Sequence, residues 1–223
     1  MKKILLPLFA LVIIPFTFSC SGVNRLTLSQ ADAAAAIRQM LELGTRENMN
    51  SSFSQQIIMQ TVFPESMRKA LSTLQTLGLS GEVDRFTNTL ALASQRTAER
   101  SIPIFVDAIN HISFTDALNI IRSGGTAATD YLKANAGADV RRSITPVMRT
   151  ALDEYNLNQQ WDRIIQPARS VLGNTLNLDL PSLMAGLVAE KMFDKIAEKE
   201  RQVRSDATYR TTPLLQRAFS RSY

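Results

Sequence analysis

The sequence predicts an all-α protein, a single multi-helix domain of about eight to ten helices that follows a cleaved signal peptide. From Ser29 onward, apolar residues recur at helical spacing, and few stretches alternate with period two. Ser, Thr, Asp, Pro and Gly residues stand at the edges of many apolar runs, as they do at helix ends. The chain has one cysteine, Cys20, so no internal disulfide is available. An apolar core must therefore hold the roughly two hundred residues that follow.

The N-terminal segment differs in kind from the rest of the chain. Lys2 and Lys3 form a basic head, and residues 4–18 are almost entirely apolar. This layout, with a small residue before a cut site, is typical of a secretory signal peptide. The apolar run is shorter than the roughly twenty residues that a membrane-spanning helix needs. We therefore expect residues 1–19 to be a signal peptide that is removed on export.

Cys20 stands where a lipoprotein signal peptidase would leave it as the new first residue. The segment Thr17-Phe18-Ser19-Cys20 resembles a lipobox, although the usual pattern has Leu where Thr17 stands and a small residue where Phe18 stands. The alternatives are an incidental cysteine after an ordinary signal peptide, or an uncleaved anchor. Several acyl chains would hold the protein stably on a membrane, whereas one alone binds only marginally. We expect residues 20–28 to be a lipidated cysteine and its tether, and residues 29–223 to be the helical domain.

These features predict a membrane-anchored lipoprotein of the cell envelope that faces the periplasm. Ser21, directly after Cys20, resembles the context that sorts lipoproteins to the outer membrane. The outer membrane is therefore favoured over the inner one, and the membrane itself is the first expected partner.

The charge pattern excludes some classes of partner. The formal net charge of +5 falls to +3 once Lys2 and Lys3 are removed, and the charges are interspersed. Without a basic stripe, an exported protein is not expected to bind nucleic acid. A single His and a single Cys leave no transition-metal cluster, and no loop has the spacing of a calcium site. We expect no metal and no cofactor.

Capping residues place the helices of the first half. Ser29 and Asp32 form a capping box, and Gly44 is a natural stop. Pro103 cannot donate a backbone hydrogen bond, so it is expected to kink or restart a helix that Ser101 caps. The expected helices are 29–43, a more polar one at 46–59, one at 65–77 between Pro64 and Gly78, 82–100, and 104–112.

Similar signals place the helices of the second half. Asp116 closes a second capping box, and Thr126 follows a Gly pair as an N-cap. Pro181 after Asp179 opens the longest amphipathic run. The expected helices end near Arg122 and Asn135, span 144–155 and 161–172, run from Pro181 past Val203, and extend from Pro213, capped by Thr212, to Phe219.

Three ordered groups of residues carry a resemblance to a known family. They are Ile104-Phe105-Val106-Asp107-Ala108-Ile109; Asp116-Ala117 with Ala127-Ala128-Thr129-Asp130-Tyr131; and Glu200, Val203-Arg204, Arg210-Thr211-Thr212-Pro213-Leu214-Leu215 and Phe219. In this order and spacing they resemble the bacterial family called domain of unknown function 4197, from Leu26 to Phe219. The resemblance implies an exported helical protein, and it supplies no reaction.

The chain departs from the family pattern in one block. The family carries Asn-Arg-Ala-Ala-Glu before the Pro-containing segment, where this chain has Ala91-Leu92-Ala93-Ser94-Gln95. The family also favours Pro where Ala207 stands. If the missing Glu and Arg carried family chemistry, this divergent member has lost it; otherwise that block was structural.

Two candidate sites lie in the middle of the chain. Exposed N–H groups at the helix start after Ser123-Gly124-Gly125-Thr126 suit an anion, although no P-loop Lys follows and a simple cap is the plainer interpretation. The second site is the acidic group Asp107, Asp116 and Asp130. Asp107 precedes His111 by four residues, so the two share a helix face, and a His–Asp pair can orient a general base. The plainer roles are a helix partner for Asp107 and a cap for Asp116.

A third candidate site is the C-terminal polar group. Glu200 and Arg204 stand in the favoured i, i+4 order, and Arg210 is in reach of Asp206 or of the acidic residues upstream. An arginine pair can grip an anionic ligand, whereas the plainer interpretation is a salt-bridged helix end that docks the last helix. The candidate ligand-binding residues are Asp107, Asp116, Thr126, Thr129, Arg204, Arg210 and Thr211, and none is assigned as catalytic.

Two hypotheses of function follow. The favoured one is a non-enzymatic envelope module that binds a partner protein or a small anionic or apolar ligand. The alternative is an envelope hydrolase or transferase that uses Asp107, Asp116 and Arg210 in one cleft. The alternative requires these side chains to converge on a pocket.

Overall fold

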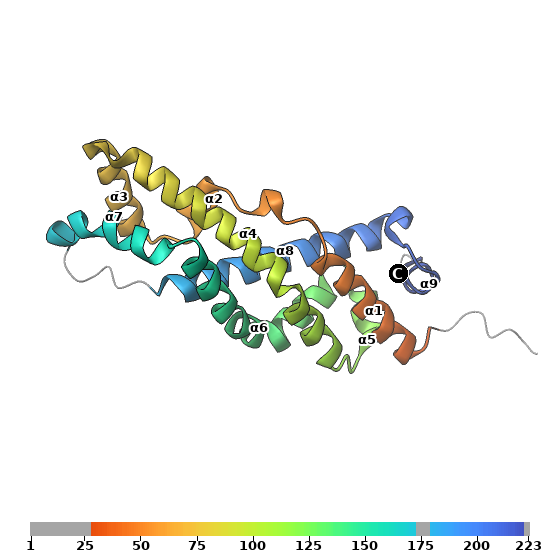
Figure 1. Cartoon of the computed structure of the whole chain (residues 1–223). Helices are drawn as coiled ribbons and strands as arrows, with labels where there is room; N and C mark the ends of the chain where they lie inside the picture. Colours follow the sequence, from red (N-terminus) through yellow and green to blue (C-terminus); the bar gives the residue numbers. More distant parts are fainter. Residues whose placement is uncertain (1–27, 173–178, 221–223) are drawn as a thin grey trace, which may run out of the picture.

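The chain folds into an assembly of helices, as its sequence predicts. The structure, a computed structural model, describes residues 28–172 and 179–220 and contains nine α-helices and no strand within them (Figure 1). The expected signal peptide and Cys20 lie outside the described residues. Among the described residues, no helix is both long and apolar enough to cross a bilayer.

Helices of very different length alternate along the chain. The first half holds α1 (Gln30–Thr45), a 3-10 turn (Asn50–Ser52), α2 (Gln55–Thr61), α3 (Glu65–Leu74), a π turn (Gln75–Leu79) and α4 (Ser80–His111). The second half holds α5 (Ala117–Ser123), α6 (Ala127–Glu154), α7 (Leu157–Leu172), α8 (Leu180–Ser205), a 3-10 turn (Ala207–Tyr209) and α9 (Pro213–Phe219).

The helix α8 is the centre of the packing. Its most extensive contacts are with α6 and α1, and α4 packs in turn against α6. Figure 1 shows α3 and α7 at one end of the molecule, α5 and α9 towards the other, and α2 alongside α4 between them. Phe193 of α8 meets Phe105 of α4 edge to face, with ring centroids 5.0 Å apart. The core therefore runs along α8, and the short helices close its two ends.

Three of the expected helix starts are confirmed by their caps. The Ser29 hydroxyl accepts the Asp32 N–H at 3.0 Å and begins α1. The Asp179 carboxylate accepts the Ser182 N–H at the start of α8. The same arrangement at Thr212 begins α9. Each cap is a local interaction between residues three apart, which is why the sequence alone predicts it.

The expected restart at Pro103 is wrong, and so is the expected gap between a helix that ends near Asn135 and one that begins at Ile144. Helix α4 continues from Ser80 to His111 through Pro103, and α6 continues from Ala127 to Glu154 through Pro146. A proline inside a helix costs about 3 kcal/mol. Burial of side chains on both sides of each proline offsets this cost: Phe105 and Ile144, for example, are fully buried. Ser101 accordingly lies inside α4 and caps nothing.

The expected helix over 46–59 is also wrong. Residues 46–49 are not helical, a 3-10 turn follows, and α2 begins only at Gln55. Ser54 is the reason, because its hydroxyl accepts the Ile57 N–H at 3.2 Å while its own backbone is extended. Met49 and Phe53 are buried and attach this irregular stretch to the core. The helix expected over 65–77 likewise ends at Leu74, where the π turn begins.

Gly44 does not stop α1 but allows it to approach α8. Gly44 lies inside the helix, and a Cβ added to it would stand 2.6 Å from the Cα of Ile196. A backbone atom cannot rotate away, so one helix would have to shift. The glycine is therefore required for this close contact between α1 and α8.

We expect Gly44→Ala to lower the free energy of unfolding by about 1–3 kcal/mol, because the added methyl group overpacks the α1–α8 contact. Urea unfolding followed by helical circular dichroism measures this change. Gly137→Ala is the matched control: this glycine lies inside α6, and its nearest neighbour would be the Lys133 Cγ at 3.5 Å. The control should gain about 0.5–1 kcal/mol from helix propensity. Equal effects of the two substitutions would contradict the close approach.

Candidate functional site

The junction between α5 and α6 brings a helix start into the protein interior. Gly124 and Gly125 have φ angles of +71° and +56°, which L side chains rarely adopt. They reverse the chain within a few residues, so that α6 begins directly after α5 at Ala127. The first N–H groups of α6 have no acceptor within the helix. They therefore need an acceptor from elsewhere in the fold.

That acceptor is the carboxylate of Glu200 in α8. One oxygen accepts the Ala128 N–H at 3.0 Å, and the other accepts the Thr129 N–H at 2.8 Å and the Thr129 hydroxyl at 2.6 Å. The Glu200 side chain has no exposed surface. A negative charge at the positive end of the α6 dipole is favourable. The anion expected at this helix start is thus supplied by the protein itself.

Arg204 balances the buried carboxylate and closes α5. Its Nε and Nη2 donate to one Glu200 oxygen at 3.0 and 2.7 Å. Its Nη1 donates to the carbonyl of Ile121 at 2.7 Å, and its Nη2 also donates to that of Ile120 at 3.1 Å. The guanidinium lies 5.2 Å from the centre of the Phe219 ring in α9. One arginine therefore joins α5, α8 and α9.

Arg210 ends α8 and does not pair with an acid as expected. Its Nε donates to the carbonyl of Val203 at 2.9 Å, and its Nη2 donates to the carbonyl of Arg204 at 2.8 Å. The last carbonyls of a helix have no intrahelical donor, so they compete successfully for the guanidinium. Asp206 instead accepts hydrogen bonds from the backbone N–H and the hydroxyl of Thr208, which lower the pKa of its carboxyl group.

The remaining C-terminal and loop candidates have local contacts. Asp116 caps α5, where its carboxylate accepts the Asn119 N–H at 3.3 Å. The Thr126 hydroxyl donates to the Asp130 carboxylate at 3.0 Å rather than accepting a backbone N–H. Thr211 is exposed. Of the seven candidates, the structure thus brings Thr129, Arg204 and Arg210 together at the end of α8.

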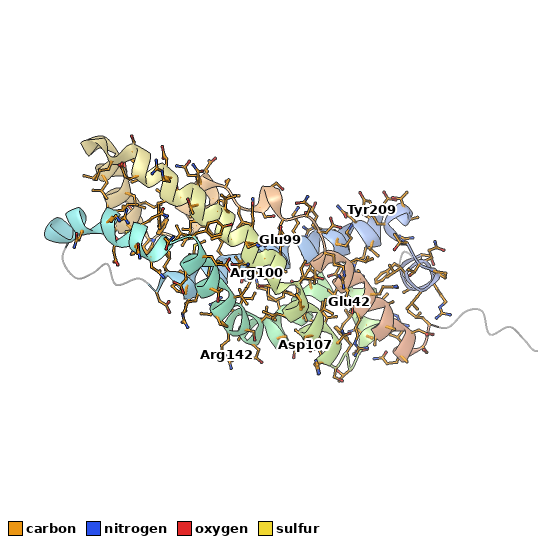
Figure 2. The ribbon with its side chains drawn as sticks, in the orientation of Figure 1. Glu42, Glu99, Arg100, Asp107, Arg142 and Tyr209 are labelled. Carbon is orange, nitrogen blue, oxygen red and sulfur yellow. The ribbon has the colours of Figure 1, made fainter. Side chains whose placement is uncertain are left out.

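Asp107 lies elsewhere, on the open side of α4. Its carboxylate is 3.2 Å from the His111 Nδ1, as the i, i+4 spacing predicts, and the two side chains are 73% and 78% exposed. Figure 2 shows Asp107 and Arg142 along the same edge of the molecule. Both Asp107 and His111 border a hollow between α4 and α6 of about 790 Å³, which we call the α4–α6 groove. Its lining residues include neither Asp116 nor Arg210.

The requirement of the enzymatic alternative is therefore not met by these residues. Asp107 borders the groove, Asp116 caps α5, and Arg210 caps α8. In the described part of the chain, no group of three or more His, Cys, Asp or Glu side chains is arranged to hold a metal ion. The arrangement at Glu200 can hold helices together, and the α4–α6 groove is an open surface bordered by one of the candidate residues, Asp107.

The comparison with known families gives one result. The model of the family described as a protein of unknown function, DUF4197, matches residues 27–220. The chain belongs to the DUF4197 family. No curated protein and no solved structure matches the chain significantly.

Two of the groups that resemble the DUF4197 pattern, residues 127–131 and the C-terminal group, meet in space although they are far apart in sequence. The block at 127–131 supplies the N–H groups that Glu200 accepts, and Phe219 lies beneath Arg204. The sequence predicts the pairing of Glu200 with Arg204 but not the contact between Glu200 and Thr129. One signal existed, because Thr129 stands at the third position of α6, where a capping box would have Glu or Gln. In the departing block, Ala93 and Ser94 are buried inside α4.

We expect Glu200→Gln to lower the free energy of unfolding by about 3–5 kcal/mol, because it leaves the largely buried Arg204 cation without its anion. Urea unfolding measures the change. Glu190→Gln is the matched control on the same helix: its partner is Lys133, and the two side chains are 44% and 46% exposed. An exposed pair contributes at most about 1 kcal/mol. Equal losses of free energy of unfolding in the two variants would show that burial does not increase the contribution of the Glu200–Arg204 pair to stability.

Proposed function

We propose that the protein is an exported envelope lipoprotein whose helical domain is a non-enzymatic binding module. One observation supports the second half of this proposal: three of the polar residues that the sequence offered for chemistry are engaged in holding helix ends. Arg204 and Arg210 donate to backbone carbonyls, and Asp116 accepts a backbone N–H. A side chain engaged in this way is not available to a substrate. The domain offers a surface, the α4–α6 groove, for binding.

The first half of the proposal rests on the N-terminal sequence. A basic head, an apolar run and Cys20 precede the domain, which begins at Gln30 with α1. A chain of about ten residues spans at most ~36 Å when fully extended. An acylated Cys20 would therefore hold the domain close to the membrane surface, where it would meet partners that are themselves attached to the envelope.

Among the described residues, the Asp107–His111 pair still favours the enzymatic alternative. The two groups are in contact and face an open groove, as a general base and its orienting group would. However, the sequence has one His, and no Ser, Thr or Cys in a nucleophile motif accompanies it. Turnover of a substrate by the purified protein, lost in both Asp107→Asn and His111→Gln, would overturn the binding-module proposal.

We expect Cys20→Ser to abolish labelling of the protein by a radioactive fatty acid and to move it from the membrane fraction to the soluble fraction. The serine hydroxyl cannot form the thioether that carries the diacylglycerol. Ser21→Ala is the control, since it alters the neighbouring residue and leaves the thiol in place. Membrane retention of the unlabelled Cys20→Ser protein would indicate an uncleaved anchor and contradict the lipoprotein proposal.

A further inference from the structure

The α4–α6 groove has the layout of a helix-binding surface. Residues from two segments line it: 103–112, which are the end of α4 and its C-cap, and 135–143 of α6. Each segment contributes less exposed aliphatic residues and more exposed polar residues. The aliphatic residues are Ile104 and Ala108 on α4, Ile112 just after it, and Ala136 and Val140 on α6.

Small side chains make the groove hollow. Ala108 and Ala136 lie in the middle of the two lining segments, where larger side chains would fill the space between the helices. Both alanines are partly accessible, whereas Val140 beneath them is buried. The floor is therefore aliphatic and reachable from solvent, and it offers space for side chains that come from outside.

The rim of the groove is acidic. Asp107 lies on the α4 side and Asp139 on the α6 side, and no Lys or Arg is among the lining residues. Arg142 reaches Asp139 from outside the groove at 2.6 Å, and these two side chains are 78% and 73% exposed. An ion pair this exposed contributes little free energy, so a second cation can compete for Asp139. Asp107 pairs with His111 at 3.2 Å, and both side chains are strongly exposed.

The dimensions fit a short helix better than a small molecule. The lining segment of residues 103–112 is about 14 Å long at the rise of an α-helix, which corresponds to roughly two and a half turns. Enclosed ligand pockets bury most of a small ligand's surface, whereas this groove is bordered by strongly exposed side chains. An amphipathic helix lays its apolar face into such a groove and keeps its polar face in solvent.

We propose that the α4–α6 groove is the docking site for a cationic amphipathic helix of a partner protein. The helix places aliphatic side chains against Ala108 and Ala136 and directs basic side chains to Asp107 and Asp139. This inference rests on the proposed function as a binding module, and it names the site and the class of partner. It does not depend on the lipid anchor.

The test uses a fluorescent synthetic helix of about 14 residues, in which leucines at helical spacing form one face and lysines the other. The protein is the mature chain, residues 20–223, with Cys20→Ser so that no lipid competes for the probe. Fluorescence anisotropy at low salt should show saturable binding. A matching helix of leucine and glutamate should bind at least about tenfold more weakly, because Asp107 and Asp139 repel it.

Two variants test the contributions of the groove's floor and rim separately. Ala136→Trp fills the hollow and should raise the Kd by at least about tenfold. Asp107→Lys changes an exposed charge and should raise the Kd by about threefold to tenfold at low salt, an effect that 0.5 M salt screens. Because Asp107 is exposed, this second variant keeps the test valid if Ala136→Trp fails to fold.

The controls make the same chemical changes outside the groove. Ala134→Trp alters an exposed alanine of α6 that does not line the groove, and Glu65→Lys alters an exposed acid of α3. Both should bind the probe as the unaltered protein does. Binding that is not saturable, that is equal for the two helices, or that survives both groove variants would overturn the inference. These outcomes leave fatty-acid labelling at Cys20 untouched, so the failure of the anchor and the failure of the groove are distinguishable.

Discussion

The carboxylate of Glu200 has no contact with solvent, and the ends of three helices are arranged around it. It supplies the acceptors for the first turn of α6, while its partner Arg204 supplies the donors for the last turn of α5 and a surface for α9. Helix ends are the costliest part of a helix to bury, because their N–H and C=O groups have no partner within the helix. The fold can bury these ends only because one ion pair satisfies them together.

The same ion pair limits which side chains are available for function. A cation and an anion that compensate each other in the interior cannot also bind a ligand without leaving a buried charge unpaired. Glu200, Arg204 and Arg210 are therefore elements of the framework, and they fix α6 relative to α8. The framework holds α6 beside α4, and the groove between them is a consequence of that position. Its shape follows from the alanines at its centre.

Close packing along α8 is the second feature that stabilises the fold. Gly44 allows α1 to approach the backbone of α8 at Ile196, and Phe105 and Phe193 interlock between α4 and α8. These contacts stabilise long helices strongly enough to carry α4 and α6 through internal prolines. Both helices that line the groove are therefore continuous along it.

The sequence by itself determined the all-α class, the caps at Ser29, Asp179 and Thr212, and the Asp107–His111 pair, because each depends on residues within one helical turn. It also placed Glu200 beside Arg204. Only the tertiary structure decided that Glu200 caps α6, that Pro103 and Pro146 are tolerated, and that Gly44 is a contact rather than a stop. Those outcomes depend on contacts between residues tens of positions apart. Burial in the folded protein sets these contacts, so the local periodicity of the sequence does not predict them.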